Sequence, residues 1–195
     1  MKGVSSLQTG LGLTIVVLLV GILGCCGVLL CASPPAALCE IETLLVDEAV
    51  FPEGWTQQEI PDSRGAPASF GVERIGIGFS TRIRGVAGQA VYRAFDIRAA
   101  VAGYRDFMSY FSVREGETEW SLPTEFTWRS QIADQFRLGC STHRNSGVQR
   151  CQFIGQYGVY LVRFHTYMSS DLMTYEDLEC ILQDIDLRMA ECLDR

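Results

Sequence analysis

The stretch Ile132–His165, IADQFRLGCSTHRNSGVQRCQFIGQYGVYLVRFH, decides the fold, because it predicts three antiparallel strands joined by two tight turns. Apolar residues alternate along it with the period of two that half-buried strands show. Turns centred at Asn145–Ser146 and at Tyr157–Gly158 place these apolar residues on one face of the sheet. A slip of one residue would turn a strand over, so the agreement supports the register. The predicted opposite pairs are Cys140 with Cys151, Phe153 with Val162, Cys151 with Phe164, and Gly155 with Tyr160.

The other face of this three-stranded segment carries a row of basic residues. They are Arg137, His143, Arg150, Arg163 and His165. Arginine pairs bidentately with carboxylate and phosphate groups, so the row is a candidate site for a small anionic ligand or an acidic segment of a protein partner. The alternative is a solvated face that neighbouring acids neutralise. Because the two cysteines lie on the opposite face from the two histidines, the four cannot bind one zinc ion, and we predict no metal site.

Patterns on either side of this segment predict the rest of an α+β domain. Two strands are expected at about 72–79 and 89–95, followed by a helix that Asp96 caps. A last helix begins after Thr174, with acidic residues in its first turn. We therefore predict an antiparallel sheet of about five strands, packed on one face against two or three helices.

The N-terminal stretch Leu11–Cys31 contains no charged residue and is long enough to cross a bilayer as one helix. We predict a membrane anchor over residues 1–32, a linker over 33–39 and one extracytoplasmic domain over 40–195. Lys2 before the stretch and acids after it favour a cytoplasmic N-terminus. An alternative stays open, since Ile22-Leu23-Gly24-Cys25 resembles a bacterial lipobox. In that case the signal ends at residue 24, and Cys25 carries a lipid on the outer side of the membrane.

Cysteine spacing suggests disulfides in an oxidising exterior. Five of the eight cysteines follow the anchor, which is an odd number. The strand register makes Cys140 and Cys151 the expected pair. Cys39 is expected to pair with Cys180 or with Cys192, and the sequence leaves that choice open. Those last two lie about 18 Å apart along one helix and cannot pair with each other, so one thiol should stay free or join another chain.

Charge and motifs argue against several classes of function. With Lys2 as the only lysine, the predicted domain carries 15 arginines against 23 acidic residues, which argues against general binding of nucleic acid or anionic lipid. The sequence has no Gly-x-Ser-x-Gly or His-Glu-x-x-His motif, and only two histidines could serve as bases. We therefore assign no catalytic residue and no cofactor, and a hydrolase is the least favoured hypothesis.

Two short sequence motifs resemble segments of known proteins. The phrases Phe51-Pro52-Glu53-Gly54-Trp55 and Gln156-Tyr157-Gly158-Val159-Tyr160-Leu161-Val162, with the order of elements, resemble uncharacterised bacterial membrane-anchored lipoproteins. More distantly, they resemble the extracytoplasmic sensor domains of bacterial serine/threonine kinases. The resemblance implies a ligand- or partner-binding domain outside the membrane, which is the leading hypothesis. The alternative is an accessory structural subunit of a membrane complex, docked through the glycine-rich face of the anchor.

Overall fold

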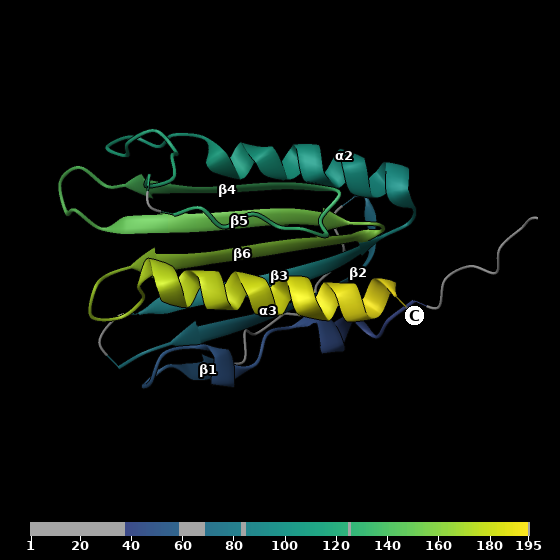
Figure 1. Cartoon of the computed structure of the whole chain (residues 1–195). Helices are drawn as coiled ribbons and strands as arrows, with labels where there is room; N and C mark the ends of the chain where they lie inside the picture. The colour runs from purple at the N-terminus through teal and green to yellow at the C-terminus, as the bar shows by residue number, and fades with distance from the viewer. Residues whose placement is uncertain (1–37, 59–68, 83–84, 125, 195) are drawn as a thin grey trace, which may run out of the picture. The chain divides into compact units, whose positions relative to one another are not determined.

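The computed structural model describes residues 38–58, 69–82, 85–124 and 126–194 (Figure 1). The predicted anchor, the lipobox cysteine and nearly all of the linker lie outside the described residues. Within the described ranges, no helix is long and apolar enough to cross a membrane. The described part forms an α+β domain built on one antiparallel sheet.

The sheet has six strands rather than the predicted five or so. Their spatial order is β1-β2-β3-β6-β5-β4. The bounds are β1 Thr56–Gln58, β2 Gly71–Ser80, β3 Val86–Ala94, β4 Gln135–Thr142, β5 Gln149–Tyr157 and β6 Tyr160–Met168. The contact between β3 and β6 joins the early hairpin to the later meander, so that residues far apart in the chain share a face. The helical elements are η1 Ile41–Leu44, η2 Glu48–Val50, α2 Ile97–Phe107, η3 Met108–Phe111 and α3 Tyr175–Leu193.

The predicted register is confirmed for the first turn and wrong for the second. Cys140 lies opposite Cys151. Across the second turn, Phe153 lies opposite Phe164, Cys151 opposite Thr166 and Gly155 opposite Val162. The loop consists of Gly158 and Val159, and Gly158 has a φ of 57° at the first of these positions, where tight hairpins commonly need glycine. The error of two residues leaves every side chain on its predicted face.

Helices cover both faces of the sheet, so the prediction of helices on one face was wrong. The stripe of α3, which includes Leu178, Ile181 and Ile185, packs with Phe153 and Phe164 in one core. On the opposite face, the α2 side, a second core forms around α2. It contains Ala100, Tyr104, Phe107, Tyr92, Ile154 and Leu161. The strand residues of this second core are Tyr92, Ile154 and Leu161, and they alternate along their strands with residues of the first core. Helix α2 forms a second layer that buries their apolar surface.

Two disulfides hold the domain together. Cys140 and Cys151 are joined between β4 and β5, as predicted. Cys39 is joined to Cys192, which settles the choice that the sequence left open. Cys192 is buried among the core residues of α3, whereas Cys180 is exposed and is the free thiol among the described cysteines. Both helix caps are also confirmed: Asp96 Oδ1 accepts from Ala99 N, and Thr174 forms a capping box with Asp177.

Candidate functional site

The α2 side of the sheet has a floor without large side chains between β2 and β6. Arg163 and His165 of β6 lie opposite Ala90 and Gly88 of β3. The next strand, β2, continues these two rows with Gly76 and Gly78. Glycine within a strand often marks a place where a ligand or another backbone approaches closely. The pairing of β2, β3 and β6 therefore creates a hollow that no single strand predicts.

A small cavity occupies this hollow, and we call it the Arg74–Arg163 cavity. Its volume is about 90 Å³, and its lining includes Arg74, Gly76, Gly88, Arg163 and His165. The imidazole of His165 depends on Gly88, because a Cβ atom built on Gly88 would lie 2.8 Å from His165 Cε1. Two guanidinium groups and one imidazole thus surround a floor of glycine and alanine.

Neither arginine of this cavity has an acidic partner among the described residues. Arg163 Cζ lies 3.8 Å from the centroid of the Tyr110 ring, and Arg74 Cζ lies 5.6 Å from that of Tyr92. In the part of the chain that the structure describes, the ion pairs join other arginines, and Nε of both Arg74 and Arg163 is buried without a hydrogen bond. The tyrosine rings orient the guanidinium groups, but no described residue supplies a counterion for their charges.

The same charges act on the titratable groups nearby. Burial, together with Arg163 and Arg150, lowers the pKa of His165 to about 4, so its ring is neutral at pH 7. Burial raises the pKa of Tyr92, while Arg74 and Arg163 oppose that shift. Gln152 lies opposite His165 on β5, and its buried Nε2 has no partner among the described residues. Donors therefore exceed acceptors on this part of the face.

A second cavity is lined by His143 and Arg150, and the arginine there is already paired with an acid. It has a volume of about 290 Å³ and is lined in part by Arg150, His143 and Glu117. Arg150 Nη2 lies 3.1 Å from Glu117 Oε1, and both side chains are largely buried. The guanidinium of Arg150 also lies over Trp120, with Cζ 4.9 Å from the ring centroid. For Arg150, the expectation that neighbouring acids neutralise the row is correct.

The structure thus divides the five predicted residues. Arg163 and His165 line the Arg74–Arg163 cavity, and Arg150 and His143 line the second cavity. Arg137 is outside both, with Cζ 4.4 Å from the centroid of Phe111. Sequence reasoning missed Arg74, although Arg74, Gly76 and Gly78 alternate along a predicted strand. What it lacked was the β3–β6 pairing that brings Arg74 beside Arg163.

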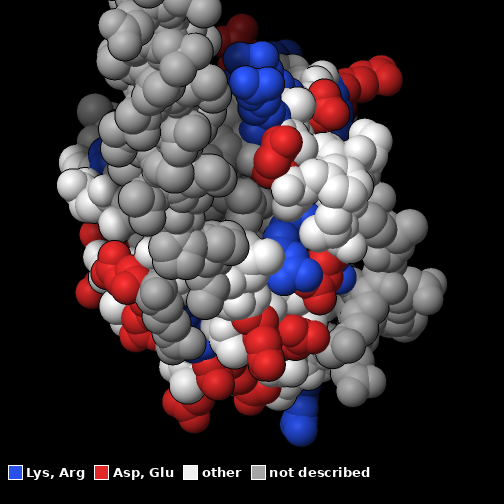
Figure 2. All heavy atoms as spheres, turned by 90° about the vertical axis from the view of Figure 1, so that its right-hand side faces the viewer, with Lys and Arg blue, Asp and Glu red and all other residues white. Residues whose placement is uncertain are grey.

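Acidic residues dominate elsewhere on the molecule. Figure 2 shows acidic side chains gathered on part of the end where α2 begins and α3 ends. The whole chain has a formal charge of −7 at pH 7. Four described arginines have a buried Nε atom without a hydrogen bond. Arg93 and Arg150 are paired with acids, whereas Arg74 and Arg163 have no acidic partner among the described residues.

Comparison with known proteins finds a likeness in fold alone. No protein-family model and no curated protein matches the chain. Among solved structures, the extracellular domain of PknH from Mycobacterium tuberculosis matches with a TM-score of 0.52 and 10% identity, over 83% of this chain and 100% of that one. The fold resembles that of a kinase's extracellular domain. The distant resemblance predicted from the sequence is thus supported at the level of fold, whereas the resemblance to lipoproteins is not tested.

Proposed function

We propose that this protein is a membrane-anchored, extracytoplasmic binding domain without catalytic activity, and that it binds an anionic ligand on the α2 side of its sheet. The observation that carries the proposal is the Arg74–Arg163 cavity. Its two guanidinium groups have no carboxylate partner among the described residues, in a strongly acidic chain. Burial of charged groups without a counterion is unfavourable, and an anion would relieve that cost.

The proposed compartment has support of a different kind. Disulfides persist mainly in oxidising environments, and this domain has two. The solved structure of similar fold is an extracellular domain. The uncharged stretch Leu11–Cys31 would hold the domain at the membrane, either as a spanning helix or through a lipid on Cys25. In both cases the ligand would come from outside the cell.

Binding of anions to the full chain in phosphatidylcholine nanodiscs tests the proposal. Two charge-assisted contacts of roughly 3 kcal/mol each correspond to a Kd of about 10–100 µM. We expect this affinity in calorimetry for at least one member of a panel of phosphates, carboxylates and acidic peptides, measured at constant ionic strength. Arg74→Gln and Arg163→Gln should each weaken binding about tenfold or more.

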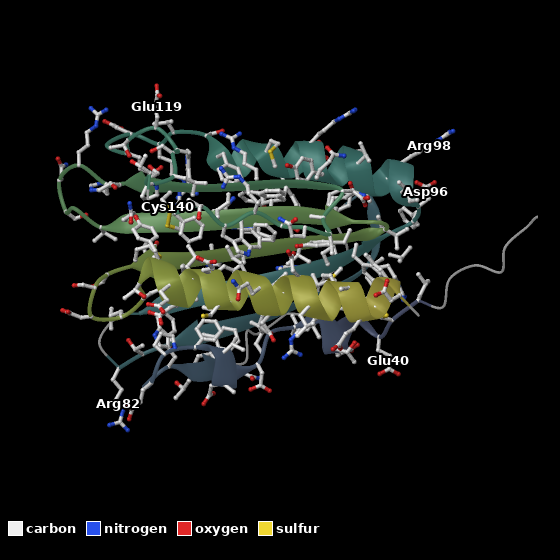
Figure 3. The ribbon with its side chains drawn as sticks, in the orientation of Figure 1. Glu40, Arg82, Asp96, Arg98, Glu119 and Cys140 are labelled. Carbon is white, nitrogen blue, oxygen red and sulfur yellow. A yellow bond between two sulfur atoms is a disulfide. The ribbon has the colours of Figure 1, made fainter. Side chains whose placement is uncertain are left out.

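Arg98→Gln is the matched control, because it removes the same charge from a side chain that points away from the sheet at the start of α2 (Figure 3). This control should bind like the wild type. A chain that binds no anion of the panel contradicts the proposal, and so does equal weakening in all three variants.

A further inference from the structure

We propose that the Arg74–Arg163 cavity takes one compact oxyanion, a phosphate or carboxylate head group, and that His165 takes up a proton when this group binds. The inference rests on the proposed function, and it specifies the class of ligand and the linkage of binding to pH. Binding of acidic peptides without binding of small oxyanions is the alternative outcome that the test below distinguishes.

The size of the cavity limits the group that enters it. A volume of about 90 Å³ is three times the roughly 30 Å³ of one water molecule in the liquid. A head group of four or five heavy atoms fits this space. The remainder of a larger ligand would extend into solvent.

The geometry of the strands suits an oxyanion bound from two sides. Arg74 comes from β2 and Arg163 from β6, and β3 lies between them. Neighbouring strands are about 4.8 Å apart, so the two backbones flank the site at roughly 10 Å. Over that gap, the fork of each guanidinium can donate to different oxygens of one bound group. Ala90 and the glycines of β2 and β3 keep the space between them open.

The groups around His165 explain why its ring would take up a proton when the anion binds. Two cations act on the ring, Arg163 on its own strand and Arg150 from β5. Arg74 from β2 lines the same cavity. On the neighbouring strands it faces uncharged Gln152 and Gly88. Glu117, in the loop after η3, is held by Arg150. The tyrosines that face the cavity and its arginines are Tyr92 and Tyr110.

A bound anion changes which protonation state of His165 the surrounding charges favour. Without it, the imidazolium form is disfavoured, and the pKa of His165 is about 4. An anion beside Arg163 offsets the repulsion between the arginine charges and the protonated imidazole. It can also accept a hydrogen bond from the protonated ring, so the pKa of His165 rises in the complex. The complex then holds more protons than the free protein, and binding tightens as the pH falls below the pKa in the complex. For each unit by which the pKa of His165 rises on binding, the affinity for the anion can increase at most tenfold as the pH falls.

Calorimetry on the full chain in phosphatidylcholine nanodiscs tests the inference with two probes. Sulfate represents the tetrahedral head group and does not itself titrate between pH 5 and 7.5, and malonate represents the carboxylate. Measurements at pH 5.5 in two buffers of different ionisation enthalpy count the protons taken up. We expect uptake of up to one proton and tighter sulfate binding at pH 5.5 than at pH 7.5. The probe that binds tighter identifies the head group.

His165→Gln separates proton linkage from binding. In this variant the affinity for sulfate should not rise between pH 7.5 and pH 5.5, and binding should take up no proton at pH 5.5. Since the variant could fold poorly, the imidazole resonance of the wild type is followed through the same titration. Its midpoint should lie near pH 4 without sulfate and move upward with it.

The outcomes distinguish this inference from the proposed function. If acidic peptides bind but sulfate and malonate do not, the inference fails while the proposed function stands. Binding of sulfate with no proton uptake and no shift of the imidazole midpoint overturns the linkage in the same way. If no anion of any size binds, both proposals fail.

Discussion

His165 and Gly88 depend on each other at the scale of single residues. Any Cβ on Gly88 would collide with the imidazole, so the ring can occupy its place against β3 only where glycine stands. That position encloses the ring between strands and beside arginines, which disfavours its charged form. A ring that is neutral in the folded protein and free to protonate in the unfolded chain affects stability as well as binding.

The sign of this effect on stability follows from the two pKa values. The pKa of His165 is about 4 in the folded protein, against 6.5 for the unperturbed group. The unfolded chain therefore binds the extra proton first, and the free energy of unfolding decreases as the pH falls from about 6.5 to about 4. The loss is at most about 3 kcal/mol. Urea unfolding between pH 7.5 and 4 should show that His165→Gln loses less stability than the wild type over this range.

His143→Gln is the matched control for that experiment, because it replaces the other histidine of the chain, which lies in the turn after β4. It should keep the pH dependence of the wild type. Equal pH dependence in the wild type and in His165→Gln would contradict the prediction.

At the scale of elements, α2 packs closely on the sheet through Gly103. A Cβ atom built there would lie 2.7 Å from Leu161 Cδ1 and 2.7 Å from Phe70 Cδ2. Alanine would favour the helix by about 1 kcal/mol, but overpacking a buried contact costs about 1–3 kcal/mol. We expect Gly103→Ala to lower the free energy of unfolding, with chemical denaturation as the measurement.

An exposed neighbour on the same helix provides the comparison. Ala102 faces solvent, so Ala102→Gly makes the opposite change without altering a packed contact. It should lower the free energy of unfolding by about 1 kcal/mol through helix propensity alone. Stabilisation by Gly103→Ala would show that α2 lies further from the sheet than described.

Local patterns explain which elements could be predicted from the sequence. The strands β4, β5 and β6 alternate apolar and polar residues, and the caps Asp96 and Thr174 mark the starts of α2 and α3. The second helix layer was missed, because Ile154 and Leu161 are only two apolar residues on a face that otherwise reads as basic. Arg163 and His165 could be assigned to one face from their spacing. Arg74 could not be added to them, since strand order depends on packing between distant segments.

At the scale of the whole molecule, the two disulfides should differ in their contribution to stability. Cys39 and Cys192 are 153 residues apart, and Cys140 and Cys151 are 11 apart. Loop-closure entropy predicts contributions of about 5 and about 3 kcal/mol respectively. We expect the double variant Cys39→Ser with Cys192→Ser to lose more stability in urea than Cys140→Ser with Cys151→Ser. The reverse order would mean that strain or residual structure outweighs chain entropy.

The exposed thiol of Cys180 can test the proposed extracytoplasmic placement of the domain. A membrane-impermeant maleimide should label the full chain on intact cells, and Cys180→Ser should abolish that labelling. Labelling that requires lysis would contradict the extracytoplasmic placement. Because Cys25, Cys26 and Cys31 also have thiol side chains that a maleimide could label, the Cys180→Ser control is needed to assign the labelling to Cys180.

The bond between Cys39 and Cys192 also bears on how the domain could be shed. It closes a covalent ring that begins one residue after the described chain starts and contains every strand of the sheet. A protease that cuts once anywhere inside this ring leaves both pieces attached to the segment before Leu38. If the segment before Leu38 anchors the domain as proposed, its release needs a cut ahead of Cys39, or a cut combined with reduction of the disulfide. The residues just before the ring are the point at which a single cleavage would set the domain free.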